Sequence, residues 1–248
     1  MSQGTTTFSE RQYNHAYPPG LERHWWCLAR TRIVDILLCD GYAGSDSILE
    51  IGCGRGMVVD ALRRLGHDCR GIELAPVDPL PAVRDAVRTG CDALALPVAE
   101  RNAVRTILLL DVLEHLDEPA AFLARLRSGF PALRRLLVTV PARSELWSNY
   151  DEYYGHKLRY GLADLARLAR DGGFTLRYAG YAFRLAYLPA WFLARTGVRR
   201  PVELRAPEGA AAILAHRIVQ WICWVEWRLL PSWLPGSSAI ACFRQGDG

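Results

Sequence analysis

The chain has 248 residues, half of them hydrophobic, and a formal net charge of +4. This length suits one large domain, or one domain with an elaboration, and the small charge argues against nucleic acid as a partner. The seven cysteines form no C-x-x-C pair and show no zinc-ligand spacing, which is typical of buried thiols in a reducing compartment.

The first predicted helix follows a polar stretch, MSQGTTTFSERQYNH, and the breaker Pro-Pro-Gly at 18–20. We predict that residues 1–20 are loosely ordered. They contain no signal-peptide core, so we expect a cytoplasmic protein. Residues 21–38 then carry apolar side chains at helical spacing, which predicts a helix.

From residue 47 onward, short apolar runs alternate with amphipathic segments. The first amphipathic segment places Val58, Leu62 and Leu65 on one helical face, and Gly66 would end that helix. Runs that are buried on both faces and separated by helices predict a parallel sheet with helices on each side. The predicted strands are 47–53, 69–74, 105–111 and 133–140.

Two further strands are predicted near the C-terminus, at 174–183 and 237–245. More than 50 residues separate them, which is far too many for a hairpin. We therefore expect an insertion between these two strands, at residues 184–235.

The run IGCGRG places Gly52, Gly54 and Gly56 where a strand turns into a helix, and their bare backbone lets a ligand lie close. The spacing differs from the G-x-G-x-x-G of dinucleotide sites. Glu50 would repel a phosphate and favour a cationic ligand. Glu73, 17 residues after the last glycine, could accept hydrogen bonds from both hydroxyls of a ribose. The pattern predicts a site for a positively charged nucleoside without phosphates.

Four motifs in order carry a family resemblance: EIGCGRG, GIEL, CDALALP at 91–97 and DVLEHL at 111–116. Together they resemble the class I S-adenosylmethionine-dependent methyltransferases, from about residue 47 to 180 and again in the last strand. The resemblance implies an α/β fold with a Rossmann-like, seven-stranded, doubly wound sheet that has one antiparallel strand. It also implies S-adenosyl-L-methionine (SAM) as the cofactor.

The same resemblance assigns roles to residues along these motifs. Glu73 would bind the ribose, and the glycines would line the cofactor. As an alternative, the glycines could form only a tight turn, and Asp92 could merely cap the segment after it. The predicted cofactor-binding residues are Glu50, Gly52, Gly54, Gly56, Glu73, Asp92 and Ala93 at the adenine, and Asp111 and Val112 near the methionine part.

In DVLEHL, the side chains of Asp111, Glu114 and His115 share one face of a helical turn. Two carboxylates and an imidazole suit a divalent cation. The ubiquinone-biosynthesis O-methyltransferases and the small-RNA 2′-O-methyltransferases carry a similar E-x-x-E-H metal motif, but Asp111 replaces its first glutamate. Metal-free relatives also carry the E-H pair, with the histidine over the cofactor or the acceptor. We predict no metal, and we keep a metal site as the alternative.

His115 and His156 are the candidate catalytic residues. His156 lies in the aromatic-rich connection 141–165, which forms part of the acceptor pocket in relatives. An imidazole can deprotonate or orient an acceptor hydroxyl near neutral pH. The alternatives are that GHKLRY only starts a helix, or that methyl transfer needs alignment and no base.

The insertion at 184–235 holds five of the eight tryptophans and is too interrupted by charge to span a bilayer. An apolar helical face within it could cover a lipophilic substrate, a second subunit or a membrane surface, or pack as an ordinary extra layer. That face consists of Leu214, Ile218, Trp221, Ile222, Val225 and Leu229. At the N-terminus, the segment ERHWWCLAR recurs in similar methyltransferases, where such a helix closes over the cofactor. Trp25, Trp26 and Arg30 are therefore candidates for that cover.

The predicted organisation is an N-terminal segment and cap helix (1–46), a SAM-binding core (47–183), a Trp-rich helical insertion (184–235) and a final core strand (236–248). The predicted function is methyl transfer from SAM to oxygen, nitrogen or carbon of a small, lipophilic acceptor. No nucleic-acid partner is expected, whereas a homodimer and a peripheral membrane contact through 184–235 stay open. The alternatives are a metal-assisted RNA or quinone/polyprenyl-lipid O-methyltransferase, and a non-catalytic SAM-binding subunit.

Overall fold

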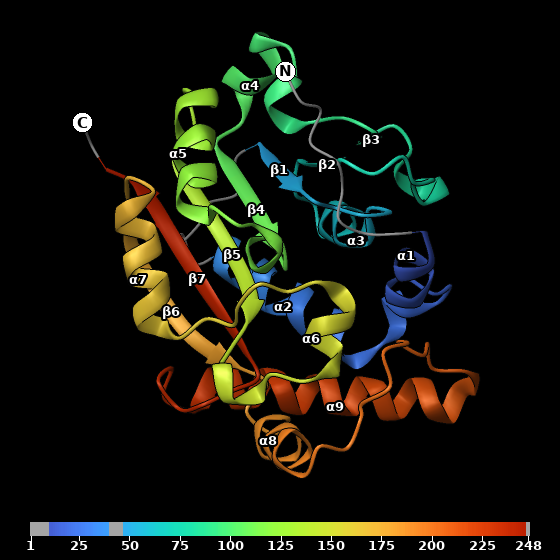
Figure 1. The fold of residues 1–248 in the computed structure, drawn as a ribbon. Helices are drawn as coiled ribbons and strands as arrows, with labels where there is room; N and C mark the ends of the chain where they lie inside the picture. Colours follow the sequence, from blue (N-terminus) through green and yellow to red (C-terminus); the bar gives the residue numbers. More distant parts are fainter. Residues whose placement is uncertain (1–9, 40–46, 247–248) are drawn as a thin grey trace.

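The computed structural model describes residues 10–39 and 47–246, and within them seven strands form one sheet (Figure 1). The strand order is β3-β2-β1-β4-β5-β7-β6, and only β7 runs antiparallel to its neighbours β5 and β6. The predicted Rossmann-like sheet with one antiparallel strand is therefore confirmed. The strands are β1 (Ile48–Ile51), β2 (Cys69–Glu73), β3 (Val87–Thr89), β4 (Thr106–Leu110), β5 (Arg135–Pro141), β6 (Phe174–Ala182) and β7 (Ser238–Gln245).

Helices cover both faces of this sheet because alternate residues of the central strands are apolar on both sides. In β4, Ile107 and Leu109 face one core with α5 and α7, whereas Leu108 and Leu110 face the other core with α2 and α3. The helices are α1 (Glu10–Ala16), α2 (Trp25–Cys39), α3 (Met57–Arg64), α4 (Val98–Ala103), α5 (Pro119–Gly129), α6 (Asn149–Tyr154), α7 (Leu162–Asp171), α8 (Tyr187–Thr196) and α9 (Gly209–Leu229).

The strand that sequence patterning misses is β3, which has three residues and pairs in parallel with β2. Val87 is buried and Arg88 is exposed, so the stretch offers only one apolar residue to a pattern search. Its position at the edge of the sheet explains why so short a strand suffices. At the N-terminus, the expectation of a loosely ordered segment is wrong for residues 10–16, which form α1. Residues 1–9 of that segment and residues 40–46 of the predicted unit 1–46 lie outside the described residues.

The carboxyl ends of β1, β2, β4 and β5 meet at one edge of the sheet, because these strands are parallel. That edge points toward the part of the molecule that holds α1 and α6 (Figure 1). In α/β sheets of this kind, ligands bind at the carboxyl edge, where neighbouring connections leave a crevice. We therefore expect the ligand site to be formed by the loops that follow β1, β2, β4 and β5.

Residues between β6 and β7 form α8 and α9 at the lower end of the molecule (Figure 1). The α9 helix packs along α2 through its side that holds Cys223 and Glu226. The buried Glu226 carboxylate accepts the backbone N–H groups of Arg184 (2.6 Å) and Leu185 (2.9 Å). The face predicted from the sequence points the other way and is largely exposed, so its ordinary packing as core is wrong. None of the described helices is long and apolar enough to cross a membrane.

Candidate active site

The glycine loop joins β1 to α3 and leaves no room for side chains. Gly52 adopts φ +78°, and a Cβ there would lie 2.7 Å from Cγ2 of Val112. Gly54 adopts φ +55°, and a Cβ there would lie 3.1 Å from the ring of Tyr17. Gly56, also at positive φ, is the residue from which α3 begins. The loop therefore needs glycine both for its backbone conformation and for the groups that lie against it.

Glu73 ends β2 and is almost fully buried beside this loop. One carboxylate oxygen accepts the N–H of Gly54 at 2.9 Å, and the other accepts the N–H of Ala75 at 2.9 Å. Each oxygen keeps a second lone pair, so the side chain can still accept from ligand hydroxyls. The backbone of the glycine loop therefore holds the Glu73 carboxylate in position. Its contact with a ribose remains a prediction.

Glu50 lies in β1 and is 3% exposed. Its Oε2 has no hydrogen-bond partner among the described residues. Burial raises the pKa of this carboxyl to about 8, although Arg30 opposes the shift. An unpaired buried carboxyl oxygen beside the glycine loop is costly by itself and suits a cationic ligand.

Arg30 of α2 reaches Asp111, which follows β4, and forms an ion pair with its Oδ2. The other carboxylate oxygen of Asp111 accepts the hydroxyl of Thr139 at 3.2 Å. The guanidinium of Arg30 also lies over the ring of Trp26, 4.2 Å from its centroid. Of the three residues predicted to cover the cofactor, Arg30 and Trp26 lie beside the site. The third, Trp25, packs edge-on against Phe183 instead.

Tyr17 lies against the glycine loop, which sequence reasoning did not anticipate. It follows α1, in the segment predicted to be loosely ordered, and its ring approaches Gly54. Burial raises its pKa well above the ordinary value for tyrosine, with Arg30 opposing that shift. No local pattern distinguishes Tyr17 from the other tyrosines, because its neighbours in space come from β1 and β2. Tyr17 therefore becomes a further residue of the site.

Asp92 follows β3 and begins a short 3-10 turn, Ala93–Ala95. Its Oδ1 accepts the N–H of Leu94 at 2.9 Å, which is the capping role considered as the alternative. Ala93 is buried, whereas Asp92 is exposed. The cap leaves the other carboxylate oxygen available, so adenine contact by Asp92 and Ala93 stays a prediction.

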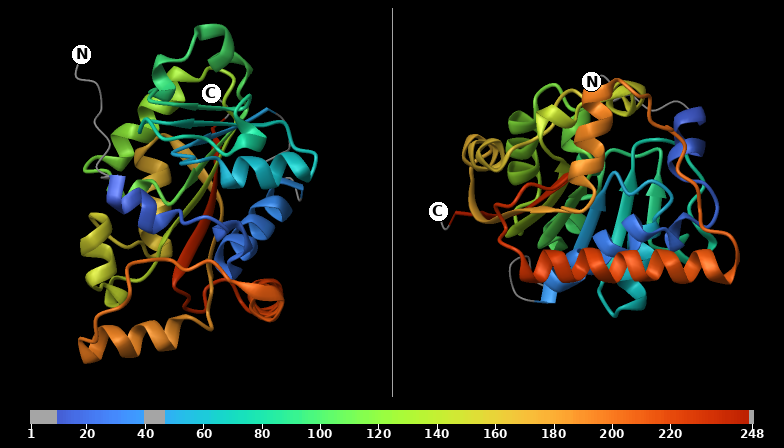
Figure 2. Two further views of the ribbon diagram at one scale, coloured as in Figure 1. Left: turned by 90° about the vertical axis from the view of Figure 1, so that its right-hand side faces the viewer. Right: turned by 90° about the horizontal axis from the view of Figure 1, so that it is seen from below.

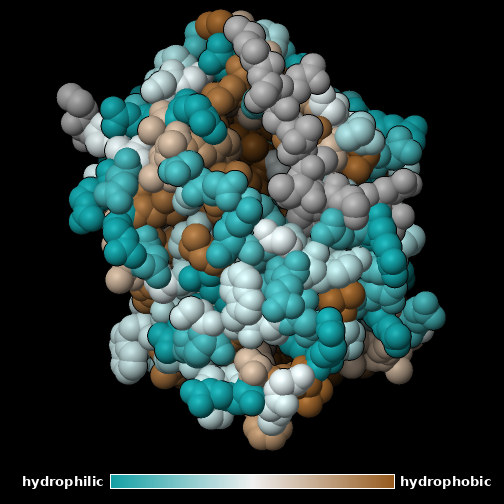
Figure 3. Space-filling model, viewed as in Figure 1, coloured by the Kyte–Doolittle hydropathy of each residue, from teal (hydrophilic) through white to brown (hydrophobic). Residues whose placement is uncertain are grey.

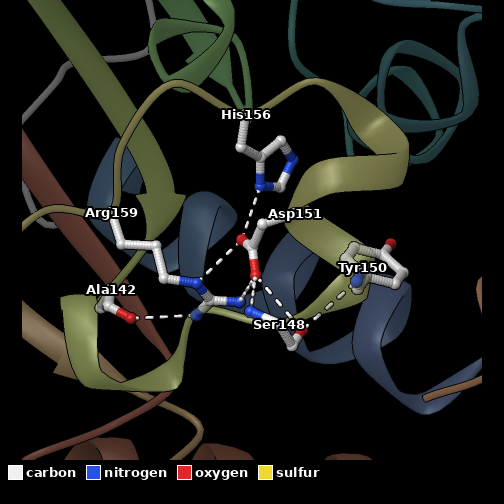
Figure 4. A network of polar contacts seen from close by, with 6 residues as sticks. All are labelled: Ala142, Ser148, Tyr150, Asp151, His156 and Arg159. Atoms are coloured by element: carbon white, nitrogen blue, oxygen red, sulfur yellow. Dashed lines mark hydrogen bonds and ion pairs between the residues drawn. The ribbon is translucent and has the colours of Figure 1, made fainter. Parts of the chain in front are cut away.

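His115 and His156 come together although 41 residues separate them. Their ring centroids are 4.9 Å apart, in an edge-on arrangement. Nδ1 of His156 donates to Oδ1 of Asp151 at 2.8 Å, and Arg159 Nε donates to the same oxygen at 2.8 Å (Figure 4). Asp151 is fully buried, and these partners hold its pKa down to about 2 against the opposing effect of burial.

Asp151 therefore acts as a fixed anion that orients His156. The carboxylate also accepts the N–H of Ser148 at 2.9 Å, within the turn that begins α6 (Figure 4). A histidine that donates through Nδ1 keeps the lone pair of Nε2 for a proton. The sequence marked His156 as a candidate, but neither Asp151 nor Arg159, whose importance depends on the fold of the loop.

Of two groups among the described residues whose side chains could hold a metal, the one at this site consists of Glu114, His115 and His156, whose ligand atoms lie within 4.8 Å of one another. Asp111 lies outside it, since its carboxylate is engaged by Arg30 and Thr139. The sequence suggested Asp111, Glu114 and His115 as the alternative set of metal ligands. In the structure His156 takes the place of Asp111 in that set. Glu114 is 1% exposed, its Oε2 has no hydrogen-bond partner among the described residues, and burial raises its pKa.

The chemistry of these groups fits SAM. The unpaired oxygen of Glu50 and the carboxylate of Glu73 surround a glycine loop, and a sulfonium nucleoside offers one positive centre and two ribose hydroxyls. A side chain at Gly54 would collide with Tyr17, so the space over the loop is already narrow. The guanidinium of Arg30, which lies near these acids, is already paired with Asp111.

A family model described as a methyltransferase domain matches residues 22–179. The ubiquinone biosynthesis O-methyltransferase of Cupriavidus pinatubonensis is 28% identical over 115 residues, which are 40% of this chain and 46% of that protein. The chain therefore matches about half the length of this curated relative.

Solved structures show a similar fold. Magnesium protoporphyrin IX methyltransferase from Synechocystis PCC 6803, with bound SAH, has a TM-score of 0.52 and 16% identity, covering 98% of this chain and 90% of that chain. Geranyl diphosphate C-methyltransferase from Streptomyces coelicolor A3(2) has a TM-score of 0.51 and 18% identity, covering 87% and 78%. At such identities these likenesses concern the fold alone.

Proposed function

The chain belongs to the family of class I S-adenosylmethionine-dependent methyltransferases, and on that premise we propose that it methylates a small, lipophilic acceptor with SAM. The observation that carries the proposal is the group of acids around the glycine loop, above all the buried, unpaired oxygen of Glu50. A cationic cofactor compensates an acid that water cannot reach.

We assign each residue of the site a role in binding the cofactor. Glu73 would hold the ribose, the loop from Gly52 to Gly56 would accommodate the cofactor, and Glu50 would favour its positive charge. When bound, SAM supplies a methyl carbon attached to a positively charged sulfur. Asp111, held by Arg30, would support the methionine part. Most of the rate would come from alignment of the acceptor with that carbon.

His156 would receive the acceptor proton. Its Nδ1 donates to Asp151, which leaves Nε2 to accept a proton as the acceptor oxygen or nitrogen forms its new bond to the methyl carbon and the bond between that carbon and sulfur breaks. His115 would pack beside it, and burial together with the neighbouring His156 lowers the pKa of His115 to about 4. At neutral pH, His115 is therefore uncharged and does not compete with His156 for a transferred proton.

Two observations support a lipophilic acceptor. The α8 and α9 helices present exposed apolar side chains at the end of the molecule near the site. Similar proteins are named for a ubiquinone pathway, for protoporphyrin and for geranyl diphosphate. A peripheral membrane contact through 184–235 accords with such an acceptor, while a homodimer remains the competing use of that surface.

A second candidate is a metal-assisted O-methyltransferase, favoured by the cluster of Glu114, His115 and His156. In that case a divalent cation would orient an acceptor hydroxyl, and EDTA would abolish activity. An RNA substrate for this reaction has less support, since the net charge of the chain is only +4. A non-catalytic SAM-binding subunit would bind the cofactor but transfer nothing.

The test uses SAM labelled on its transferable methyl group, incubated with the protein and an extract of the source cells. Organic, aqueous and macromolecular fractions are then separated. We expect label in the organic fraction, and much less of it when Glu73→Ala protein is used at a SAM concentration that does not saturate the variant. Label in the macromolecular fraction would point to another acceptor class, and no transfer by protein that binds SAM would support the non-catalytic subunit.

A further inference from the structure

The α9 helix exposes one continuous apolar face to solvent. Leu214 is 59% exposed, Ile218 51%, Trp221 59% and Leu229 74%. These positions recur at helical spacing, so they line the same side of the helix. The opposite side is held in the fold through buried Cys223 and Glu226. The helix is therefore fixed in position while its most apolar side has no protein partner among the described residues.

The α8 helix lies at the same end of the molecule as α9 (Figure 2) and exposes a second set of apolar side chains. Leu188 and Phe192, one helical turn apart, are 69% and 62% exposed, and Leu185 just before the helix is 60% exposed. Hydrophobic residues reach the surface along this lower end, among hydrophilic ones, in the view of Figure 3. Exposed apolar surface of this extent on two helices marks an interaction site.

The exposed charged side chains within α8 and α9 have one sign, although the exposed Glu208 precedes α9 as its N-cap. The exposed charged residues of α8 and α9 are arginines: Arg195 on α8, and Arg217 and Arg228 on α9. The one acid in the two helices, Glu226, is buried and bonded to backbone N–H groups. The three arginines and the apolar side chains together favour a partner that is apolar and anionic. A second copy of the same surface would bring arginines against arginines, with no exposed acid of α8 or α9 to pair with them.

The segment that joins α8 to α9 is tied to helices that border the candidate site. Asn149 of α6 exchanges two hydrogen bonds with the backbone of Arg200, at 2.8 and 2.9 Å. The hydroxyl of Tyr154 donates to the carbonyl of Val202 at 2.7 Å, and the N–H of Leu204 donates to the carbonyl of His15 in α1 at 3.1 Å. Whatever α8 and α9 contact is thus held at a defined distance from the site.

A cavity of about 690 Å³ lies between α2, α3 and α9. Trp221 of the exposed face lines it together with Leu28, Met57 and Trp224, and Arg30 lines it too. Arg30 is also the partner of Asp111. The cavity, whose lining also includes polar side chains such as Glu22 and Gln220, therefore extends from Trp221 of α9 to a residue of the candidate site.

We propose that α8 and α9 dock this protein on the surface of an anionic lipid bilayer, where, resting on the proposed function, it meets a lipid-borne acceptor. The apolar side chains enter the boundary between headgroups and acyl chains, tryptophans lie at that boundary, and the arginines face the anionic headgroups. The contact is peripheral, since neither helix is long and apolar enough to cross a membrane.

The test is co-sedimentation of the full chain with vesicles of phosphatidylcholine alone, and of phosphatidylcholine with phosphatidylglycerol. We expect binding to the anionic vesicles that weakens with added salt, and little binding to the neutral ones. The Leu188→Ser/Phe192→Ser and Leu214→Ser/Ile218→Ser variants should each bind about tenfold more weakly or worse. Arg217→Gln should reduce binding about fivefold.

The matched control is Val98→Ser, which removes a side chain that is 61% exposed on α4, at the other end of the molecule. It should bind vesicles like the unaltered protein. Because all these residues are exposed, the variants should keep the melting temperature and the SAM affinity of the parent. Sedimentation needs neither SAM nor acceptor, so failure of the proposed methyl transfer would leave this readout intact.

Two results would overturn the proposal. One is binding to anionic vesicles that the variants of α8 and α9 do not alter. The other is a concentration-dependent dimer, seen by analytical ultracentrifugation, that Leu214→Ser/Ile218→Ser dissociates while the parent protein does not bind vesicles. The second result would assign the surface to another copy of this chain.

Discussion

Arg30 and Asp111 form an ion pair that joins α2 to the end of β4, with the side chain of Arg30 8% exposed and that of Asp111 26% exposed. The pair binds a helix from the N-terminal region to the carboxyl edge of the sheet, beside Glu50 and the glycine loop. Both halves are needed, because a guanidinium buried without its carboxylate would remain uncompensated.

Asp111→Asn should therefore lower the free energy of unfolding by about 3 kcal/mol, since it leaves Arg30 buried without an anion. Chemical denaturation measures the change. The control is Asp85→Asn, which breaks the surface pair with Arg63, where the Asp85 side chain is 70% exposed. That change should cost less than about 1 kcal/mol. Equal effects of the two substitutions would show that the Arg30 pair contributes no more than a surface contact.

Glu73→Ala should weaken SAM binding by about tenfold to 100-fold, because it removes a charged acceptor for ligand hydroxyls. It also leaves the N–H groups of Gly54 and Ala75 without their partner, so the melting temperature should fall although the fold persists. Isothermal titration calorimetry and circular dichroism provide the two readouts. Unchanged affinity in a folded variant would contradict the ribose assignment.

SAM binding should release protons near pH 7 because of Glu50, whose pKa burial raises to about 8. A carboxyl with a raised pKa stabilises the free fold below its unfolded value of about 4.5, and that contribution is lost as the pH rises through about 8. A bound cation favours the ionised form, so about one proton should leave per cofactor.

Calorimetry in two buffers of different ionisation enthalpy measures this proton release. The Glu50→Gln variant should release none from this site, whereas Glu100→Gln, at the surface on α4, should behave like the parent. Equal proton release from the Glu50→Gln protein would mean that another group ionises.

His156→Ala should lower kcat by about 10²–10⁴-fold in the labelled-methyl assay if His156 receives the acceptor proton. SAM affinity should be unchanged. His67→Ala is a matched control, because Nε2 of His67 lies 2.9 Å from Oδ1 of Asp35, in a similar His–Asp pair in the C-terminal half of α2. The same assay with EDTA examines the cluster of Glu114, His115 and His156. Activity that EDTA abolishes, and that zinc or magnesium restores, would favour the metal-assisted reaction.

Acid should destabilise the protein between about pH 6.5 and pH 4, because burial lowers the pKa of His24 to about 4, with a smaller effect from His216. The folded state holds this imidazole neutral, so its contribution is full above the unfolded pKa of about 6.5 and declines as the pH falls toward 4. Nδ1 of His24 accepts the N–H of Trp26 at 3.2 Å at the start of α2.

His24→Asn keeps an acceptor at this helix start and cannot take up a proton. Thermal melting from pH 7.5 to pH 4.5 should therefore show a smaller loss for the variant than for the parent. Identical pH profiles would exclude His24 as a source of acid sensitivity and leave His115, whose pKa is also lowered to about 4.

Much of the fold was predictable because its signals are local. The alternation of buried runs and amphipathic helices requires a parallel sheet, and the glycines of IGCGRG occur where positive φ angles and close contacts exclude other residues. The missed strand, β3, shows the limit of such signals: a three-residue edge strand carries too few apolar positions to be recognised.

What the sequence alone determined is the alternation of strands and helices, apart from β3, and the position of Glu50 and Glu73 in strands next to the glycine loop, because strands and tight turns impose requirements within a few residues. Only the tertiary structure decided that Tyr17 lies on Gly54, that Asp151 orients His156, and that the apolar face of α9 remains exposed. These relationships join elements that are distant in the chain or concern which side of a helix packs. Contacts between distant elements and the choice of the buried side of a helix depend on how the helices pack against the sheet. A local sequence pattern does not contain that information.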